Sequence, residues 1–182
     1  MLDGAARIDA MVQEAARLEM PAIAVTDHGN TFAAFEFYKA AKNVGIKPIV
    51  GIEAYVTPGT HRSDKARVRW GSPEQSSDDV SGAGAYTHMT LLSESTEGMH
   101  NLFRLSSLAS MEGYYFKPRM DREILQKYAK GLIATTGCPS GEIQTRLRLG
   151  QYDAARAAAA EFQDIFGKEN YFAEIMDHGL SI

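Results

Sequence analysis

The sequence predicts an α/β fold in which short strands alternate with amphipathic helices. Five apolar runs of strand length are separated by helical or loop segments, and each run ends in or contains a residue type that binds metals. The runs are TDHGN at 26–30, GIEAYV at 51–56, AYTHM at 85–89, ATTGC at 134–138 and EIMDHG at 174–179. Since successive strand–helix units bring the carboxyl ends of their strands to one rim, we expect four side chains to converge there. These are His28, Glu53, His88 and Cys138.

The amino-terminal third contains two helix patterns, each followed by a strand. The first has apolar residues at helical spacing, and Asp3 is well placed to cap it. Pro21 stops that helix and opens a strand at 22–26. A second helix pattern ends at Gly45 and leads into a strand at 48–56. Two such units favour a parallel sheet. The apolar positions are Ala5, Ile8, Met11, Val12, Ala15 and Leu18 in the first helix, and Phe32, Phe35, Ala40 and Val44 in the second.

The segment 57–85 interrupts this alternation. It is rich in Gly, Pro, Ser and Asp, so we predict a long loop or an insertion. Regular structure resumes with a strand at 86–92, and Asp121 is expected to cap a later helix. The remaining expected elements are a helix at 101–109, strands at 132–136 and 171–175, and helices at 142–149 and 152–166.

Composition excludes several classes of protein. The 182 residues suit one domain with a substantial core, and the net charge of −4 provides no general attraction for nucleic acid. A single cysteine excludes an internal disulfide. No apolar run has the roughly 20 residues of a membrane span, and the start lacks the features of a secretory signal. We therefore expect a soluble, cytoplasmic protein that does not enter membranes.

Each candidate ligand also has an ordinary structural interpretation. His28 could hydrogen-bond a turn, and His88 could be a satisfied core histidine. Glu53 lies in an apolar strand, where a buried carboxylate needs a partner or a metal, although strand alternation could turn it to solvent. Cys138 could be a small buried hydrophobe, but the flanking glycines leave room for a ligand. No Cys-His signature supports a catalytic thiol.

Other polar residues give weaker signals. Glu174 could face either side of its strand, and Asp177 and His178 could equally cap a helix or lie in a loop. Lys65, Arg67 and Arg69 beside Trp70 could hold a phosphate backbone by charge and stacking, although a solvated loop is the simpler interpretation. We interpret His61 and His100 as surface residues.

The blocks TDHGN, GIEAYV and TTGCPSGE, in this order, together with NYFAEIMDHGL near the end, closely resemble the PHP (polymerase and histidinol phosphatase) domain of bacterial DNA polymerase III alpha subunits. The resemblance extends over essentially the whole chain. It implies a distorted (β/α)7 barrel whose rim holds divalent ions, commonly zinc or manganese. The positions that match the metal ligands of the family are Asp3, His28, Glu53, His88 and Cys138, with Asp27 and Thr136 as supporting residues around them.

Two departures from the family pattern accompany this resemblance. Family members carry a His-x-His strand before the Leu-Asp-Gly-Ala segment and an Asp-x-His pair beyond the position of Ile182. We therefore expect residues 1–182 to be a partial PHP domain, incomplete at both ends and inactive alone.

The resemblance implies a fragment of a replicative DNA polymerase, whose own nucleotidyl transfer uses magnesium. DNA and other replisome subunits, such as the sliding clamp, are the implied partners. Intact PHP sites support 3′-5′ exonuclease proofreading, while decayed ones serve as a structural scaffold. A free-standing PHP phosphoesterase that acts on small phosphates is a third alternative.

Overall fold

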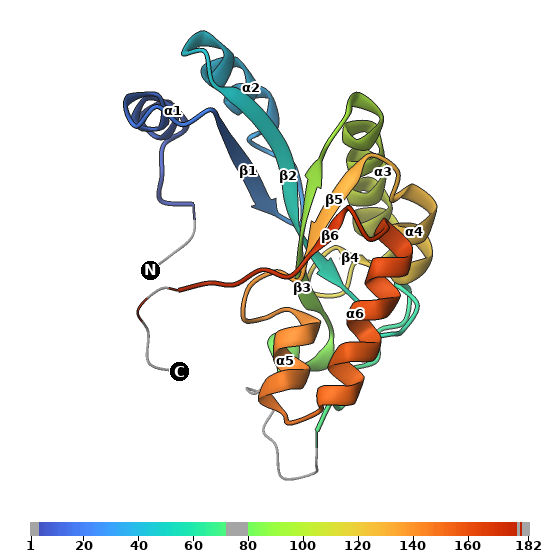
Figure 1. The fold of residues 1–182 in the computed structure, drawn as a ribbon. Helices are drawn as coiled ribbons and strands as arrows, with labels where there is room; N and C mark the ends of the chain where they lie inside the picture. Colours follow the sequence, from blue (N-terminus) through green and yellow to red (C-terminus); the bar gives the residue numbers. More distant parts are fainter. Residues whose placement is uncertain (1–3, 72–79, 178, 180–182) are drawn as a thin grey trace.

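The computed structural model describes residues 4–71, 80–177 and 179, and a mixed sheet runs through it (Figure 1). Strand β1 (Ala22–His28) is parallel to β2 (Lys47–Val56), as expected. Strand β3 (Thr87–Ser93) is antiparallel to β2, and β5 (Leu132–Thr135) is antiparallel to β3. The expectation of a parallel sheet was therefore wrong beyond β2. The long segment after β2 returns the chain to the end where β2 finishes, so β3 runs back along it.

Two very short strands complete the sheet. Strand β6 (Tyr171–Phe172) is parallel to β5, and β4 (Arg119–Met120) is parallel to the last residues of β2. Only two residues of the strand expected at 171–175 pair with a neighbour. Among the residues that the structure describes, β1 and β6 lie at the two ends of an open sheet. The sequence and the structure agree on a mixed α/β fold.

Six α-helices accompany the sheet in the described part of the chain. Asp121 caps α4 by accepting a hydrogen bond from the N–H of Ile124, as predicted. Helix α1 begins after Arg7, whose side chain makes no capping hydrogen bond. Asp3, the predicted cap, lies outside the described residues. The helices are α1 (Ile8–Arg17), α2 (Ala34–Asn43), α3 (Thr96–Glu112), α4 (Arg122–Tyr128), α5 (Glu142–Arg148) and α6 (Tyr152–Phe166).

The two faces of the sheet have different roles. Successive strand residues point to opposite faces, so the apolar positions of β2, β3 and β5 share one face. That face packs against residues of α3, α4 and α6 to form the main core, whereas β1 packs with α1 and α2 in a smaller cluster. The other face carries His28, Glu53 and His88, which are exposed or half-buried. The helices therefore leave the polar face of the sheet accessible.

The described parts of the segment 57–85 form no α-helix or strand, as expected for a loop, and contain only a 3-10 turn, η2 (Ser81–Gly84). This loop is nevertheless tied to the fold. The guanidinium of Arg119 is fully buried and donates to the carbonyls of Arg62, Asp64 and Ala85. It also donates to the carbonyl of Gly113. One side chain thus fixes two loops to β4.

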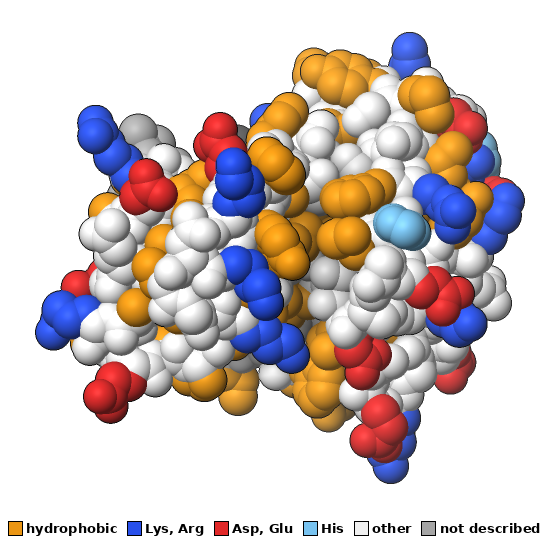
Figure 2. Space-filling model, turned by 90° about the horizontal axis from the view of Figure 1, so that it is seen from above, with side chains coloured by type: hydrophobic (Ala, Val, Ile, Leu, Met, Phe, Trp, Pro, Cys, Tyr) orange, Lys and Arg blue, Asp and Glu red, His pale blue; other side chains and the backbone are white. Residues whose placement is uncertain are grey.

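The sheet divides where β2 begins. In the described residues, ladder pairing with β3 starts only at Gly51, and before it the Ser93 hydroxyl donates to the carbonyl of Val50. Figure 2 looks at this end of the molecule and shows a hollow lined by hydrophobic side chains, between the half that contains α1 and α2 and the half that contains α3. Strands β1 and β2 run away from this end, and their carboxyl ends lie near the middle of the fold (Figure 1). Among the described helices, none has both the length and the apolar character needed to cross a membrane.

Candidate metal centre

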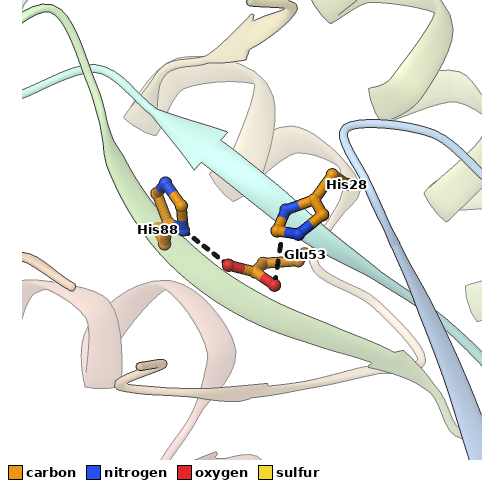
Figure 3. A group of neighbouring side chains, drawn as sticks. All are labelled: His28, Glu53 and His88. Carbon is orange, nitrogen blue, oxygen red and sulfur yellow. Dashed lines mark hydrogen bonds and ion pairs between the residues drawn. The ribbon is translucent and has the colours of Figure 1, made fainter. Parts of the chain in front are cut away.

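Three side chains from three strands converge on the polar face of the sheet (Figure 3). Glu53 lies between the two histidines, with one carboxylate oxygen facing each. Its Oε1 is 2.5 Å from Nδ1 of His88, and its Oε2 is 3.5 Å from Nδ1 of His28. One ligand atom from each of the three residues lies within 4.8 Å of the others. The group therefore has the spacing of side chains that share a metal ion.

Strand register explains this convergence. His28 is the last residue of β1 and is the direct parallel partner of Glu53. His88 pairs with Tyr55, two residues from Glu53 and on the same face of β2. The expected convergence at strand ends holds for His28. His88 instead lies near the amino end of β3, because that strand is antiparallel. It reaches the same place from the opposite direction.

Cys138 extends the group from the loop after β5. Its Sγ lies 3.7 Å from Nδ1 of His88 and 3.8 Å from Oε1 of Glu53. The loop is held against β3 because the N–H of His88 donates to the carbonyl of Ser140 at 3.1 Å. Gly137 is required here, since its φ is +79° and an added Cβ would lie 3.0 Å from the carbonyl oxygen of His88. The four residues expected to converge are thus neighbours.

The charges in this group are strongly coupled. Burial alone would lower the pKa of His88, but hydrogen bonds with Cys138 and Glu53, and the charges of the same two groups, raise it to about 9. Without a cation, His88 is therefore the positive partner of the carboxylate. The N–H of Ser140 also points at Sγ of Cys138, at 3.4 Å. The protein thus places a hydrogen-bond donor beside both the Glu53 carboxylate and the Cys138 sulfur.

The donor set fits a divalent ion. Four ligands around a tetrahedral zinc ion, with bonds of about 2.0–2.3 Å, lie roughly 3.3–3.8 Å from one another. Three separations match this range, although the two that involve Glu53 use different carboxylate oxygens. They are His28 Nδ1 to Glu53 Oε2 at 3.5 Å, His88 Nδ1 to Cys138 Sγ at 3.7 Å and Glu53 Oε1 to Cys138 Sγ at 3.8 Å. The contact of 2.5 Å between His88 and Glu53 is shorter than this range, as expected for two side chains that are hydrogen-bonded to each other rather than held apart by an ion. The imidazole, carboxylate and thiolate set suits zinc, and without the sulfur also manganese.

Aromatic side chains enclose the group, and the sequence analysis missed them. Tyr55 lies on the same face of β2 as Glu53, and its ring is 5.2 Å from that of His88 and 6.2 Å from that of His28. Tyr86 packs edge-on against Tyr55 at 4.9 Å. Burial, followed by the nearby groups Tyr86 and Glu53, raises the pKa of Tyr55. The alternation within GIEAYV would have placed Tyr55 beside Glu53.

The weaker candidates have structural roles in the described part of the chain. Asp27 accepts a hydrogen bond from the N–H of Ala33 at 2.7 Å and so holds the turn into α2. Thr136 accepts from Gln144 and from the N–H of Glu174, whose carboxylate accepts from Thr135. Asp177 is exposed and accepts from the N–H of Gly179. Asp3 and His178, by contrast, lie outside the described residues.

The basic group divides into two parts. Lys65, Arg67 and Arg69 are exposed. Trp70 is buried, and the guanidinium of Arg146 lies 4.6 Å above its ring. The proposed stacking of a base on Trp70 was therefore wrong, because the indole is already packed within the protein.

A second cluster of residues that could bind a metal ion already contacts an arginine side chain of the protein. His61, Asp121 and Glu123 are also close enough to share an ion. The guanidinium of Arg62, however, donates to Asp121 at 3.0 Å and to Glu123 at 3.4 Å. This guanidinium already contacts both carboxylates, so among the described residues we take the cluster on the sheet face as the candidate metal centre.

Comparison with known proteins gives a consistent result. The PHP domain family matches residues 1–178. The chain is 61% identical over 189 residues to the DNA polymerase III alpha subunit of Saccharopolyspora erythraea. This alignment covers all of this chain and 16% of that protein. It is 58% identical to the alpha subunit of Mycobacterium leprae over 183 residues, covering all of this chain and 16% of that protein. For Thermus aquaticus the identity is 43% over 182 residues, covering 99% of this chain and 14% of that protein. The chain therefore spans about a sixth of the length of the first two of these curated relatives.

Proposed function

This chain belongs to the PHP domain family and corresponds to the PHP segment of DNA polymerase III alpha subunits, and we propose that it forms a metal-dependent 3′-5′ exonuclease site for proofreading. The observation that carries the proposal is the convergence of His28, Glu53 and His88 on one open face of the sheet. A purely structural domain would have no need to keep a carboxylate and two imidazoles accessible there.

The side chains have distinct proposed roles. His28, Glu53, His88 and Cys138 would hold the ion, and Asp3 would join them in the family pattern. When bound, a divalent ion supplies Lewis-acid chemistry for phosphodiester hydrolysis. Asp27 holds the turn that follows His28, and the N–H of Ser140 orients the thiol of Cys138. The thiol is a soft donor, so we propose zinc ahead of manganese.

The proposal extends to the larger protein. By similarity to its relatives, we propose that the whole protein is a cytoplasmic DNA-directed DNA polymerase that uses magnesium for extension. Its partners would be DNA and replisome subunits, including the sliding clamp. We also propose that the described strands belong to a (β/α)7 barrel, in which the polar face of this sheet is the interior.

The test is a paired assay on one mismatched primer-template, performed with the full-length protein. Glu53→Gln keeps the shape of the side chain but removes its charge, and His88→Asn removes a nitrogen donor. We expect either change to reduce metal-dependent release of 3′ nucleotides by about 100-fold or more, and primer extension by less than about threefold.

Matched controls use the same substitutions on the surface. Glu169→Gln and His100→Asn alter exposed residues outside the cluster and should leave both activities unchanged. The competing function is a scaffold that only stabilises the polymerase. It predicts no excision in the wild type and a loss of stability or extension in both cluster variants. Excision that survives both cluster substitutions would exclude this site as the proofreading centre.

A further inference from the structure

A short loop beside the metal centre exposes two aromatic rings. We call residues 114–118 the aromatic loop. Tyr114 is 62% exposed and Phe116 is 60% exposed, although rings of this size are usually buried. The φ of Phe116 is +62°, in the left-handed region that a bulky side chain rarely adopts. The fold therefore maintains an unfavourable backbone conformation that directs a large apolar ring into solvent.

The aromatic loop is anchored from below. The N–H of Tyr115 donates to the carbonyl of Lys117 at 3.1 Å, which closes a tight turn. The buried guanidinium of Arg119 lies 5.0 Å from the centre of the Tyr115 ring and donates to the carbonyl of Gly113. Tyr115 and Phe116 pack together, with ring centres 4.5 Å apart. The exposed ring of Phe116 is thus held in place before any ligand arrives, which reduces the entropy cost of binding.

The aromatic loop also adjoins the candidate metal centre. Lys117 Nζ lies 5.6 Å from the centre of the Tyr55 ring, and that ring contacts both His28 and His88. On the same side, an added Cβ at Gly29 would lie 2.8 Å from Cγ of Pro118. Gly29 directly follows His28, the last residue of β1. The aromatic loop and the cluster are therefore neighbours, joined through the buried Tyr55 ring.

Cations accompany the rings. The guanidinium of Arg67 lies 5.3 Å from the centre of the Phe116 ring, and Lys117 is exposed. Exposed rings that alternate with Lys and Arg suit a nucleic acid strand, because unpaired bases stack on the rings while the cations contact phosphates. A duplex keeps its bases inside the helix and cannot use such rings. The combination therefore favours an unpaired strand.

We propose that the aromatic loop binds the single-stranded 3′ segment of a DNA primer, with a base stacked on Phe116 and with Arg67 and Lys117 on the phosphates. This inference rests on the proposed exonuclease function, for which it names the substrate form. Excision would then require the primer end to separate from its template. A mismatched end separates more readily than a paired one, so the loop would favour mismatched primers.

The first test uses Phe116→Trp in the full-length protein, which keeps an aromatic ring and places a fluorescent reporter at the site. Metal is removed with chelator, so the measurement does not depend on hydrolysis. An oligothymidylate of about eight nucleotides should quench the emission that the new indole adds over the wild type. An abasic strand of the same length should leave that emission unchanged, because it has no base to stack.

The second test uses Phe116→Gly, which removes the ring and fits the positive φ. Its melting temperature should equal or exceed that of the wild type, while KM for a single-stranded substrate rises roughly five- to hundredfold. For the abasic strand, KM should not change. Tyr152→Ala is the matched control, since this ring is 67% exposed at the start of α6, outside the aromatic loop. It should leave KM at the wild-type value.

The outcomes separate the two proposals. If saturating oligothymidylate does not alter the emission of Phe116→Trp, the strand-binding role is overturned, even if excision depends on Glu53. Quenching without any excision in the wild type would overturn the exonuclease function and leave the strand site in place. A lower melting temperature for Phe116→Gly with unchanged KM would show that the ring serves only packing, or a protein partner, and would also overturn the inference.

Discussion

Single charged residues in this protein are stabilised by contacts that a sequence does not reveal. Asp121 is an example, because it is both the cap of α4 and the partner of Arg62. It is only 3% exposed and accepts from the backbone N–H groups of Arg62 and Ile124 and from the Arg62 guanidinium. Burial alone would raise the pKa of Asp121, but these hydrogen bonds and the Arg62 charge outweigh burial and lower it from 3.8.

This lowered pKa predicts a defined acid dependence of stability. The charged form of Asp121 stabilises the folded state fully above pH 3.8, and that contribution disappears as the pH falls through the lower folded-state pKa. Asp121→Asn keeps the cap but not the charge, so it should lower the free energy of unfolding by about 1–2 kcal/mol at neutral pH. The difference from the wild type should shrink below pH 3.8.

Urea unfolding at several pH values measures this effect. Asp121→Ala also removes the cap and should cost about 1 kcal/mol more than Asp121→Asn. Asp164→Asn, on the exposed face of α6, is the control and should have no effect at any pH. A difference between Asp121→Asn and wild type that does not change with pH would contradict the role of the charge.

At the scale of elements, the metal centre depends on the pairing of three strands. Period-two alternation in each strand could be predicted from the sequence, and it puts His28, Glu53 and His88 on one face once the register is known. The direction of β3 could not be predicted in this way. It follows from how the loop 57–85 returns to the sheet, and that path is set by contacts with Arg119, far along the chain.

The same reasoning explains which local predictions succeeded. The helix α6 and the Asp121 cap have strong local signals, in helix propensity and in side-chain capping, and both were confirmed. The strand expected at 171–175 was too long, because a strand ends where its neighbour ends and β5 is short. The burial of Trp70 was also missed, since the packing partner Arg146 belongs to α5, more than seventy residues later.

Arg119 is predicted to join the elements that shape the site. Its guanidinium donates to four backbone carbonyls in two loops, and Arg119→Met keeps the aliphatic volume but leaves those carbonyls without their donor. We expect the free energy of unfolding to fall by about 3 kcal/mol. Hydrogen exchange at the N–H of Val68, which donates to Gly84, should accelerate.

Arg119→Lys should rescue little, because one ammonium cannot span carbonyls on two loops. Arg156→Met, on the exposed face of α6, is the matched control and should change neither quantity. Unaltered stability and exchange in Arg119→Met would show that the loops hold their positions through other contacts.

The whole molecule is a sheet with one covered face and one accessible face. Helices bury the apolar face, while the other face presents donors, aromatic rings and the adjoining aromatic loop. This asymmetry could be anticipated from the alternating sequences of the strands. Its function could not, since the aromatic loop and Tyr55 reach the metal centre only through tertiary packing. The central claim is that the accessible face is built to hold a divalent ion.

Anomalous diffraction from crystals of the full-length protein soaked with zinc or manganese tests that claim most directly. We predict a peak about 2.0–2.3 Å from ligand atoms of His28, Glu53 and His88, with Sγ of Cys138 as a further ligand of zinc. The same peak should be absent in crystals of Glu53→Gln and present in those of Glu169→Gln. A wild-type map without a peak at these three side chains, at metal concentrations that support excision, would contradict the account.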